Sequence, residues 1–358
     1  MAYSTINKSS LHQDGKTYLG SASAVTTTGL GFQPDLVWIK DRDNGNNHCL
    51  VDAVRGVGKY IESDNDGAEV DNSTNSISAF TSDGFTTGTA NPANEQASTT
   101  KGFMSWNWKA NGAGSANTDG SIISTVSANT TAGFSIVKWT GTGSNATVGH
   151  GLGVAPRFIM MKNTSNVASW GVYHESMGND KRLFLDTNGA ESGGNWQDTS
   201  PTSTVFSVDG GTITGGSGHV EIAYCFADVS GYSKFGSYIG NGNNGDGTFI
   251  YLGFKPSYVL IKQTNTTGNW ALSDNKRLTN SGNQDGGQGN YIPHMLATNS
   301  ATAESGFGGG SSNKIDYLSN GFKMRDNGAY GNTSGGTYIY MAFGQPIISN
   351  SGVVATAR

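Results

Sequence analysis

The sequence is poor in cysteine, in charge and in long apolar runs, and each shortage argues against a class of protein. Only two cysteines, Cys49 and Cys225, occur in 358 residues, so we expect neither a disulfide framework nor a thiolate zinc site. No apolar run approaches the length of about 18 residues that a membrane span needs. Charged residues make up 14% of the chain, the net charge is −5, and no basic stripe is present, which argues against nucleic-acid binding.

Glycine and aromatic residues are what the chain has in quantity. It contains 53 glycines, aromatics reach 10%, and serine, threonine and asparagine are frequent. Disordered chains lack aromatics, and helical proteins carry long runs of glutamate, lysine and leucine that are absent here. The composition therefore predicts a β-rich protein with many glycine and asparagine turns.

One phrase recurs three times along the chain: GFQPDLVWIK (31–40), GVAPRFIMMK (153–162) and GFKPSYVLIK (253–262). In each copy a lysine follows a proline by six residues, although the chain has only seven prolines. Recurrence at such spacing is typical of repeated structural units. The motif residues are Pro34, Lys40, Pro156, Lys162, Pro256 and Lys262.

Each copy of the phrase lies within a longer repeat that ends in an Asp-Gly or Asn-Gly hairpin and a closing aromatic strand. The fold class we predict is all-β, with three tandem antiparallel β-sandwich or jelly-roll-like modules. The predicted divisions are an N-terminal arm (1–14), module 1 (15–112), a linker (113–129), module 2 (130–228), module 3 (229–346) and a C-terminal tail (347–358).

Within the phrase, the segment DLVWIK predicts a central strand. Both of its faces are apolar, which indicates burial between two layers. We expect the proline to open the strand, where its missing N–H costs little. We expect the lysine to end it and to extend its ammonium group into water.

The residues after the phrase are the candidates for ligand binding. Trp170 and Trp270 each lie eight residues after the motif lysine, and aromatic faces beside polar groups suit sugar rings. The candidate binding residues are Trp170, Tyr173, His174, Trp270 and Asp274. The alternative interpretation places the tryptophans in the core of a strand, and module 1 has His48 at that position.

Catalytic and metal-binding patterns are weak. Glycosidases need two carboxylates across the scissile bond, and no acidic pair recurs in all three repeats, so we predict no enzyme; a polysaccharide-degrading glycosidase or lyase is the alternative. Stretches 41–45 and 62–72 gather oxygen ligands, but neither completes a calcium-binding loop. We therefore predict no cofactor and no metal, with a structural divalent ion as the alternative.

Several long phrases resemble a family of virion proteins from bacteriophages of marine bacteria and cyanobacteria. They are MAYSTINKSS (1–10), TAGFSIVKWTGTGSNATVGHGLGVAPRFIMMKN (131–163), GYSKFGSYIGNG (231–242) and GGTYIYMAF (335–343). The resemblance implies a structural virion component, and such proteins are described as tail-fibre-like or structural, without agreed catalytic residues.

The expected role is therefore a non-enzymatic tail fibre, appendage or exterior capsid component that also contacts host surface glycans. The N-terminus has neither the basic nor the apolar region of a signal peptide, so we expect synthesis in the host cytoplasm and a final location in the virion. The expected partners are other virion proteins, bound through the N-terminal arm, and further copies of the chain, with a trimer favoured. Nucleic acid and membrane insertion are not expected.

Overall fold

The computed structural model describes residues 4–277, 291–292, 294–304 and 314–346, and the predicted C-terminal tail lies outside them. The described residues confirm the predicted all-β fold, because strands dominate and the two helical segments, η1 (Ser9–Leu11) and η2 (Glu175–Met177), are single 3-10 turns. Within the described part of the chain, no helix has the length and apolar character that a membrane crossing requires.

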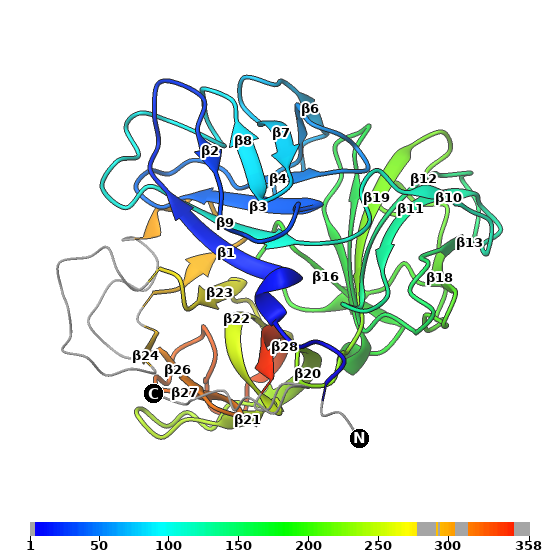
Figure 1. Ribbon diagram of the computed structural model, residues 1–358. Coiled ribbons are helices and arrows are strands. Elements are labelled where there is room, and N and C mark those ends of the chain that lie inside the picture. Colours follow the sequence, from blue (N-terminus) through cyan, green and yellow to red (C-terminus); the bar gives the residue numbers. More distant parts are fainter. Residues whose placement is uncertain (1–3, 278–290, 293, 305–313, 347–358) are drawn as a thin grey trace.

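Each of the three repeats contributes a main antiparallel sheet whose four central strands follow the same order (Figure 1). In that order the first strand pairs with the closing strand, which pairs with the strand of the repeated phrase, which pairs with the strand after it. The strands of module 1 are β1 (Gln13–Tyr18), β9 (Phe103–Trp108), β3 (Leu36–Asp41) and β4 (Cys49–Asp52). Those of module 2 are β12 (Phe134–Thr140), β19 (Val220–Phe226), β14 (Phe158–Asn163) and β15 (Gly171–His174). Those of module 3 are β20 (Ser233–Ile239), β28 (Thr337–Pro346), β22 (Phe254–Gln263) and β23 (Ala271–Asp274).

Further strands extend these sheets or form a second, outer layer. The main sheet of module 2 is extended by β10 (Ser115–Asn117), β11 (Ser124–Asn129), β16 (Lys181–Phe184) and β17 (Ser192–Gly193), and that of module 3 by β25 (Leu296–Ala297). The outer sheets are β2 (Thr26–Thr27), β8 (Gly84–Thr87) and β7 (Ile77–Thr81) in module 1, and β13 (Ala146–Gly149) and β18 (Val205–Val208) in module 2. In module 3 the outer sheet consists of β21 (Phe249–Tyr251), β27 (Gly321–Met324), β26 (Ile315–Leu318) and β24 (Tyr291–Ile292). Module 1 also contains a two-stranded ribbon, formed by β5 (Lys59–Tyr60) and β6 (Val70–Asp71).

The strand of the repeated phrase is buried on both faces, as its sequence predicted. In β3, Val37 and Ile39 face the outer sheet of their own module. Leu36 and Trp38 point the other way, into a core that all three modules share. Because side chains alternate across a strand, one strand serves two cores. The modules are therefore packed around a common centre, with module 1 at the top of Figure 1, module 2 at the right and module 3 below.

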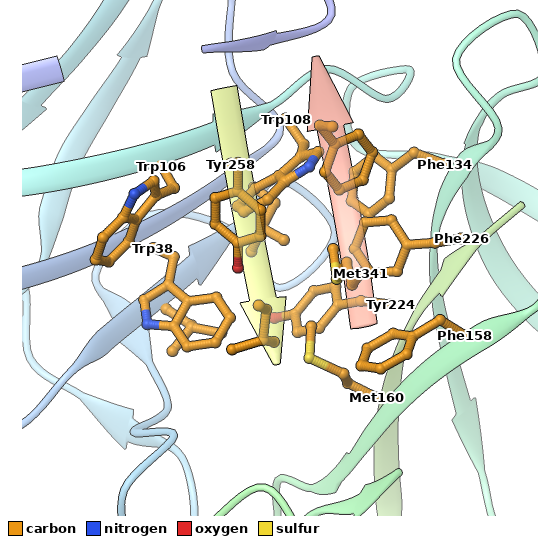
Figure 2. Close-up of a cluster of buried hydrophobic side chains, with 14 of the residues drawn as sticks. Trp38, Trp106, Trp108, Phe134, Phe158, Met160, Tyr224, Phe226, Tyr258 and Met341 are labelled. Atoms are coloured by element: carbon orange, nitrogen blue, oxygen red, sulfur yellow. The ribbon is translucent and has the colours of Figure 1, made fainter. Parts of the chain in front are cut away.

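Three equivalent aromatic residues meet at this centre. Trp108, Phe226 and Phe343 occupy the same register position, opposite the residue that lies two positions after the motif proline in each module. Their ring centroids are 6.2, 6.0 and 5.9 Å apart in the three possible pairs, which is the spacing of favourable edge-to-face contacts. Figure 2 shows Trp108 and Phe226 in this cluster, with Tyr258 against Trp108.

Two of the predicted segment boundaries are wrong. The predicted linker (113–129) contains β10 and β11, and β11 pairs with β12 along six residues, so this segment is part of the module 2 sheet. The predicted arm (1–14) runs into β1, which begins at Gln13. In both places short polar strands complete a sheet edge, and their composition resembles that of a linker.

The described part of the arm packs on the chain itself. Ile6 is 1% exposed and belongs to the shared core. The Ser9 hydroxyl donates to the Gln345 side chain at 2.8 Å, which joins the arm to the last strand of module 3. Residues 4–14 therefore contribute to the packing of this chain, which the prediction of an arm that binds a partner did not include.

Candidate functional site

The residues that recur after the proline are gathered at the three junctions between modules. The prolines themselves only partly follow the prediction. Pro34 and Pro156 precede β3 and β14 by two residues, whereas Pro256 lies inside the longer β22. The register of β22 shifts between Pro256 and Tyr258, and such a bulge accommodates a residue that lacks an N–H.

The motif lysines are buried, so the prediction that they reach water is wrong. Lys40, Lys162 and Lys262 are all 0% exposed. Their ammonium groups donate to the backbone carbonyl of the last residue of the strand: Asp41 O at 2.7 Å, Asn163 O at 2.7 Å and Gln263 O at 2.5 Å. Burial lowers the pKa of each of these lysines to about 8. The lysines face inward because the strand end meets another module, which sequence periodicity does not reveal.

Two of these lysines also reach the neighbouring module. The Nζ of Lys40 donates to Ala301 O of module 3 at 3.0 Å, and that of Lys162 to Asp66 O of module 1 at 3.3 Å. The junction of modules 3 and 2 uses a backbone group instead, because the Gly268 N–H donates to Asn188 O at 2.9 Å. Each strand end is therefore tied to the adjacent module.

The acceptors of these bonds lie in three equivalent stretches, which we call the acceptor segments: residues 62–69, 184–191 and 297–304. Each ends in Ala-Glu. The N–H groups of Glu69, Glu191 and Glu304 donate to the carbonyls of Thr164, Thr264 and Arg42, at 2.9, 2.9 and 3.1 Å. Module 2 thus binds the acceptor segment of module 1, module 3 that of module 2, and module 1 that of module 3, so the ring of modules is closed.

The position eight residues after the lysine binds the same acceptor segments. The indole N–H of Trp170 donates to Glu62 O, and that of Trp270 to Phe184 O, both at 2.8 Å. In module 1 His48 has this role, since its Nε2 lies 3.0 Å from Ala297 O. Histidine replaces tryptophan here without loss of the bond, because both rings present an N–H at the end of a flat side chain.

The position twelve residues after the lysine makes the contact on the opposite side of each module. Asp52 accepts from the Tyr224 hydroxyl of module 2 at 2.8 Å, and Asp274 from the Trp106 indole of module 1 at 3.1 Å. The His174 Nε2 lies 3.2 Å from the backbone oxygen of Tyr340 in module 3.

The change from aspartate to histidine has a physical reason. Met341 occupies the register position that Trp106 and Tyr224 occupy in the other modules, and a methionine has no polar hydrogen to offer a carboxylate. The Nδ1 of His174 accepts from the Ser176 N–H at 3.0 Å, so the Nε2 carries the proton and donates to the carbonyl. Burial lowers the pKa of His174 to about 4, which keeps the ring neutral.

The junction of modules 3 and 1 carries an additional ion-pair cluster. The Glu304 carboxylate accepts from Arg42 at 2.8 Å and from Arg277 at 2.7 Å, and all three side chains are at most 2% exposed. Arg277 also pairs with Asp274 at 2.6 Å. This is the one junction that no direct chain connection supports, so the cluster reinforces the place where the ring closes.

The predicted binding residues are all part of these junctions or of a module interior. Trp170, Tyr173, His174, Trp270 and Asp274 are at most 2% exposed. They do not line a surface site, and the prediction that they bind a glycan is wrong in this structure. The alternative interpretation of the tryptophans as core residues is the one the structure supports, because their rings lie in the shared core.

The oxygen-rich stretches are occupied by hydrogen bonds within the chain. Asp41 accepts from the backbone N–H groups of Asp43 and Asn44 and from the side chains of Asn46 and Ser98. Among the residues that the structure describes, no three histidine, cysteine, aspartate or glutamate side chains gather as a metal site would require. In stretch 62–72, Glu62 and Glu69 likewise accept from Asn47 and Arg55.

One buried carboxyl group stands apart. Glu221 is 0% exposed, and neither of its oxygens has a hydrogen-bond partner among the residues that the structure describes. Burial raises its pKa to about 9, with a smaller opposing effect of Lys162. It lies opposite Asn163 on β14, where modules 1 and 3 have Phe103 and Tyr338 at the equivalent place. It is a neutral acid at a position that holds an aromatic ring in the other two modules.

The acceptor segments were not among the predicted features, although the sequence carries a signal for them. The tripeptides Gly67-Ala68-Glu69, Gly189-Ala190-Glu191 and Thr302-Ala303-Glu304 recur once in each module. They are short, and the glutamate follows the motif lysine by 29 residues in modules 1 and 2 but by 42 in module 3. An alignment of the modules on their prolines therefore does not bring all three together.

Comparison with known protein families identifies the family of the chain. The family described as a domain of unknown function, DUF7483, matches residues 8–346, a range that includes all three modules. No curated protein and no solved structure matches the chain. Because this match extends over nearly the whole sequence, the chain belongs to the DUF7483 family.

Proposed function

We propose that the chain is a non-enzymatic structural component of a bacteriophage virion, as a tail fibre, an appendage or an exterior capsid protein. The observation that carries the proposal is the use of the recurring polar side chains. At the positions eight and twelve residues after each motif lysine, all six side chains bond to a neighbouring module. Residues employed in this way give rigidity and are not free for chemistry.

The sequence resemblance described above supports the assignment to a bacteriophage particle. A closed ring of modules also suits a particle component, because hydrogen bonds tie each strand end to the adjacent module and give one rigid unit. The three modules have the arrangement that a trimer of single modules would have. We therefore propose that one chain is already a complete unit, and that any further assembly, such as the predicted trimer, uses its outer surface.

The proposal is tested on purified virions of a phage that encodes the chain. Mass spectrometry of the particles and labelling with antibody in electron micrographs should place the protein on the tail or on the capsid exterior. The proposal fails if density-purified particles lack the protein while lysates contain it. A fixed number of copies for each particle would further distinguish a structural component from a contaminant.

A further inference from the structure

Two aromatic side chains on the outer sheet of module 3 face the solvent side by side. Phe249 and Tyr251 are 44% and 56% exposed, whereas Ile250 between them is 5% exposed and points into the module core. They lie on β21, which pairs with β27 at the edge of its sheet in the described part of the chain, at the lower rim of the molecule in Figure 1. Residues two apart on a strand are about 7 Å apart, so the two rings form a continuous apolar strip.

Module 1 shows which residues occupy the positions equivalent to Phe249 and Tyr251 in another copy of the fold. Its strand β2 is the counterpart of β21, because Thr27 lies opposite Phe85 as Ile250 lies opposite Phe322. Thr27 and Ile250 are both buried, and the residues on either side of each are exposed. In module 1 those exposed neighbours are Thr26 and Thr28, and in module 3 they are the two aromatics. The shared fold therefore does not require aromatic rings at these places.

The two rings are held in position by their surroundings. The Nζ of Lys234 donates to Tyr251 O at 2.8 Å and lies 5.4 Å from the centre of the Tyr251 ring. A Cβ atom added at Gly321 would lie 3.2 Å from the Phe249 ring, so that ring covers the glycine backbone. Side chains that are already ordered lose little entropy when they bind a ligand.

Polar groups that suit hydroxyls surround the strip. Lys323 lies opposite Phe249 and forms an ion pair with Asp246, whose side chain is 77% exposed. The exposed Asn243 and Asn244 lie in the loop that joins β20 to β21. Ammonium, carboxylate and amide groups together can donate and accept hydrogen bonds, which a ligand with many hydroxyl groups requires.

The size of the strip argues against a stable protein partner. An aromatic side chain carries roughly 150–250 Å² of surface, so the exposed parts of the two rings amount to about 200 Å². A stable protein interface needs about 800 Å² on each partner, and the adjoining loop is polar. The flat apolar face of one or two sugar rings matches both the area and the polar margin.

We propose that Phe249 and Tyr251 form a saccharide-binding platform, on which two sugar rings stack while Lys323, Asp246 and the loop asparagines bind their hydroxyls. The inference rests on the proposed function only for the source of the saccharide, which would be a polysaccharide of the host surface. It places glycan contact on the rim of module 3, away from the buried tryptophans.

Binding is measured with the purified full-length chain on an array of bacterial O-polysaccharides, capsular polysaccharides and defined neutral and acidic oligosaccharides, followed by titration of the best binder. The test variant is Phe249→Thr/Tyr251→Thr, which gives module 3 the residue types of module 1. The control is Val167→Thr, an exposed apolar residue in module 2. Circular dichroism and the urea midpoint establish that both variants fold.

We expect the unmodified chain and the control to bind equally, and the double variant to bind at least about tenfold more weakly, since each ring contributes stacking energy. The inference is overturned if the unmodified chain binds no saccharide of the array, or if the double variant binds as well as the control. It is also overturned if the double variant only abolishes self-association in sedimentation, which would assign the strip to a second copy. Absence of the protein from virions, with saccharide binding intact, would refute the proposed function alone.

Discussion

The three acceptor-segment glutamates allow a graded test of the junctions, because they share a backbone position and differ in their side-chain partners. The carboxylate of Glu304 is buried and accepts from two arginines. That of Glu69 is 18% exposed and pairs with Arg55 and Lys59 at 3.2 and 3.5 Å. Glu191 forms no ion pair with any residue that the structure describes. Replacement by glutamine keeps the shape, removes the charge and turns one acceptor oxygen into an NH2 donor.

We expect Glu304→Gln to lower the free energy of unfolding by about 3–5 kcal/mol, because it leaves two buried guanidinium groups without their shared carboxylate. Glu69→Gln should cost about 1 kcal/mol, since its pairs are partly exposed. Glu191→Gln should stay within about 0.5 kcal/mol. Urea denaturation followed by tryptophan fluorescence measures all three variants against the unmodified chain. Equal losses at the three positions, or a larger loss at Glu191 than at Glu304, would refute the reasoning.

The same comparison has a pH dependence. The arginines Arg277 and Arg42 hold the pKa of Glu304 below its ordinary value of 4.5, against the opposing effect of burial. The stability that this carboxylate contributes is therefore present above about pH 4.5 and is lost as the pH falls through the folded-state pKa. Glu304→Gln should remove this acid-induced loss, and an unchanged acid transition would contradict the assignment.

Two further predictions concern buried side chains, and a third concerns the enzyme alternative. Glu221 holds a proton in the folded chain up to a pKa of about 9 but releases it near 4.5 when unfolded. The free energy of unfolding should therefore fall as the pH rises through this window, by up to about 1.4 kcal/mol per pH unit. Glu221→Gln should lack this fall, and urea midpoints of the variant and the unmodified chain that run parallel from about pH 5 to about pH 9 would contradict the prediction. Trp270→Phe and Trp170→Phe should each cost about 1–3 kcal/mol because a buried carbonyl loses its donor, and a cost near zero at both positions would argue against the junction bonds. Bacterial capsule incubated with the protein should keep its chain length in size-exclusion chromatography, and shortened polysaccharide would favour the glycosidase or lyase alternative.

The repeated phrase was sufficient to predict the all-β fold, because strand periodicity is a local property. The two-sided apolar pattern of β3, with Leu36 and Trp38 against Val37 and Ile39, correctly indicated burial on both faces. What the pattern does not contain is the identity of the layer on each side. One of the two layers is formed by the other two modules. A contact between residues about a hundred positions apart produces no periodic pattern in the sequence.

The same limit explains the incorrect site prediction. A tryptophan beside an aspartate in a polar segment has the composition of a sugar-binding surface, and Trp270 with Asp274 fits that description. The side chains are buried because the two adjacent modules cover them. The Phe184 carbonyl of module 2 accepts from Trp270, and the Trp106 indole of module 1 donates to Asp274. The exchange of Trp170 for His48 in module 1 was a usable signal, since both side chains share only a ring N–H, which suggests a conserved hydrogen bond more than a stacking face.

The central claim is that the three modules form one closed unit around a shared core, and native-state hydrogen exchange of the full-length chain tests it most directly. Trp108 packs against Phe226 and Phe343 at the centre. Trp108→Leu therefore alters the sequence of module 1 alone but removes aromatic contacts of all three modules. The account predicts that the amides of β3, β14 and β22 lose protection together and by similar free energies. A loss confined to β3 and its neighbours in module 1, with β14 and β22 unchanged, would contradict it.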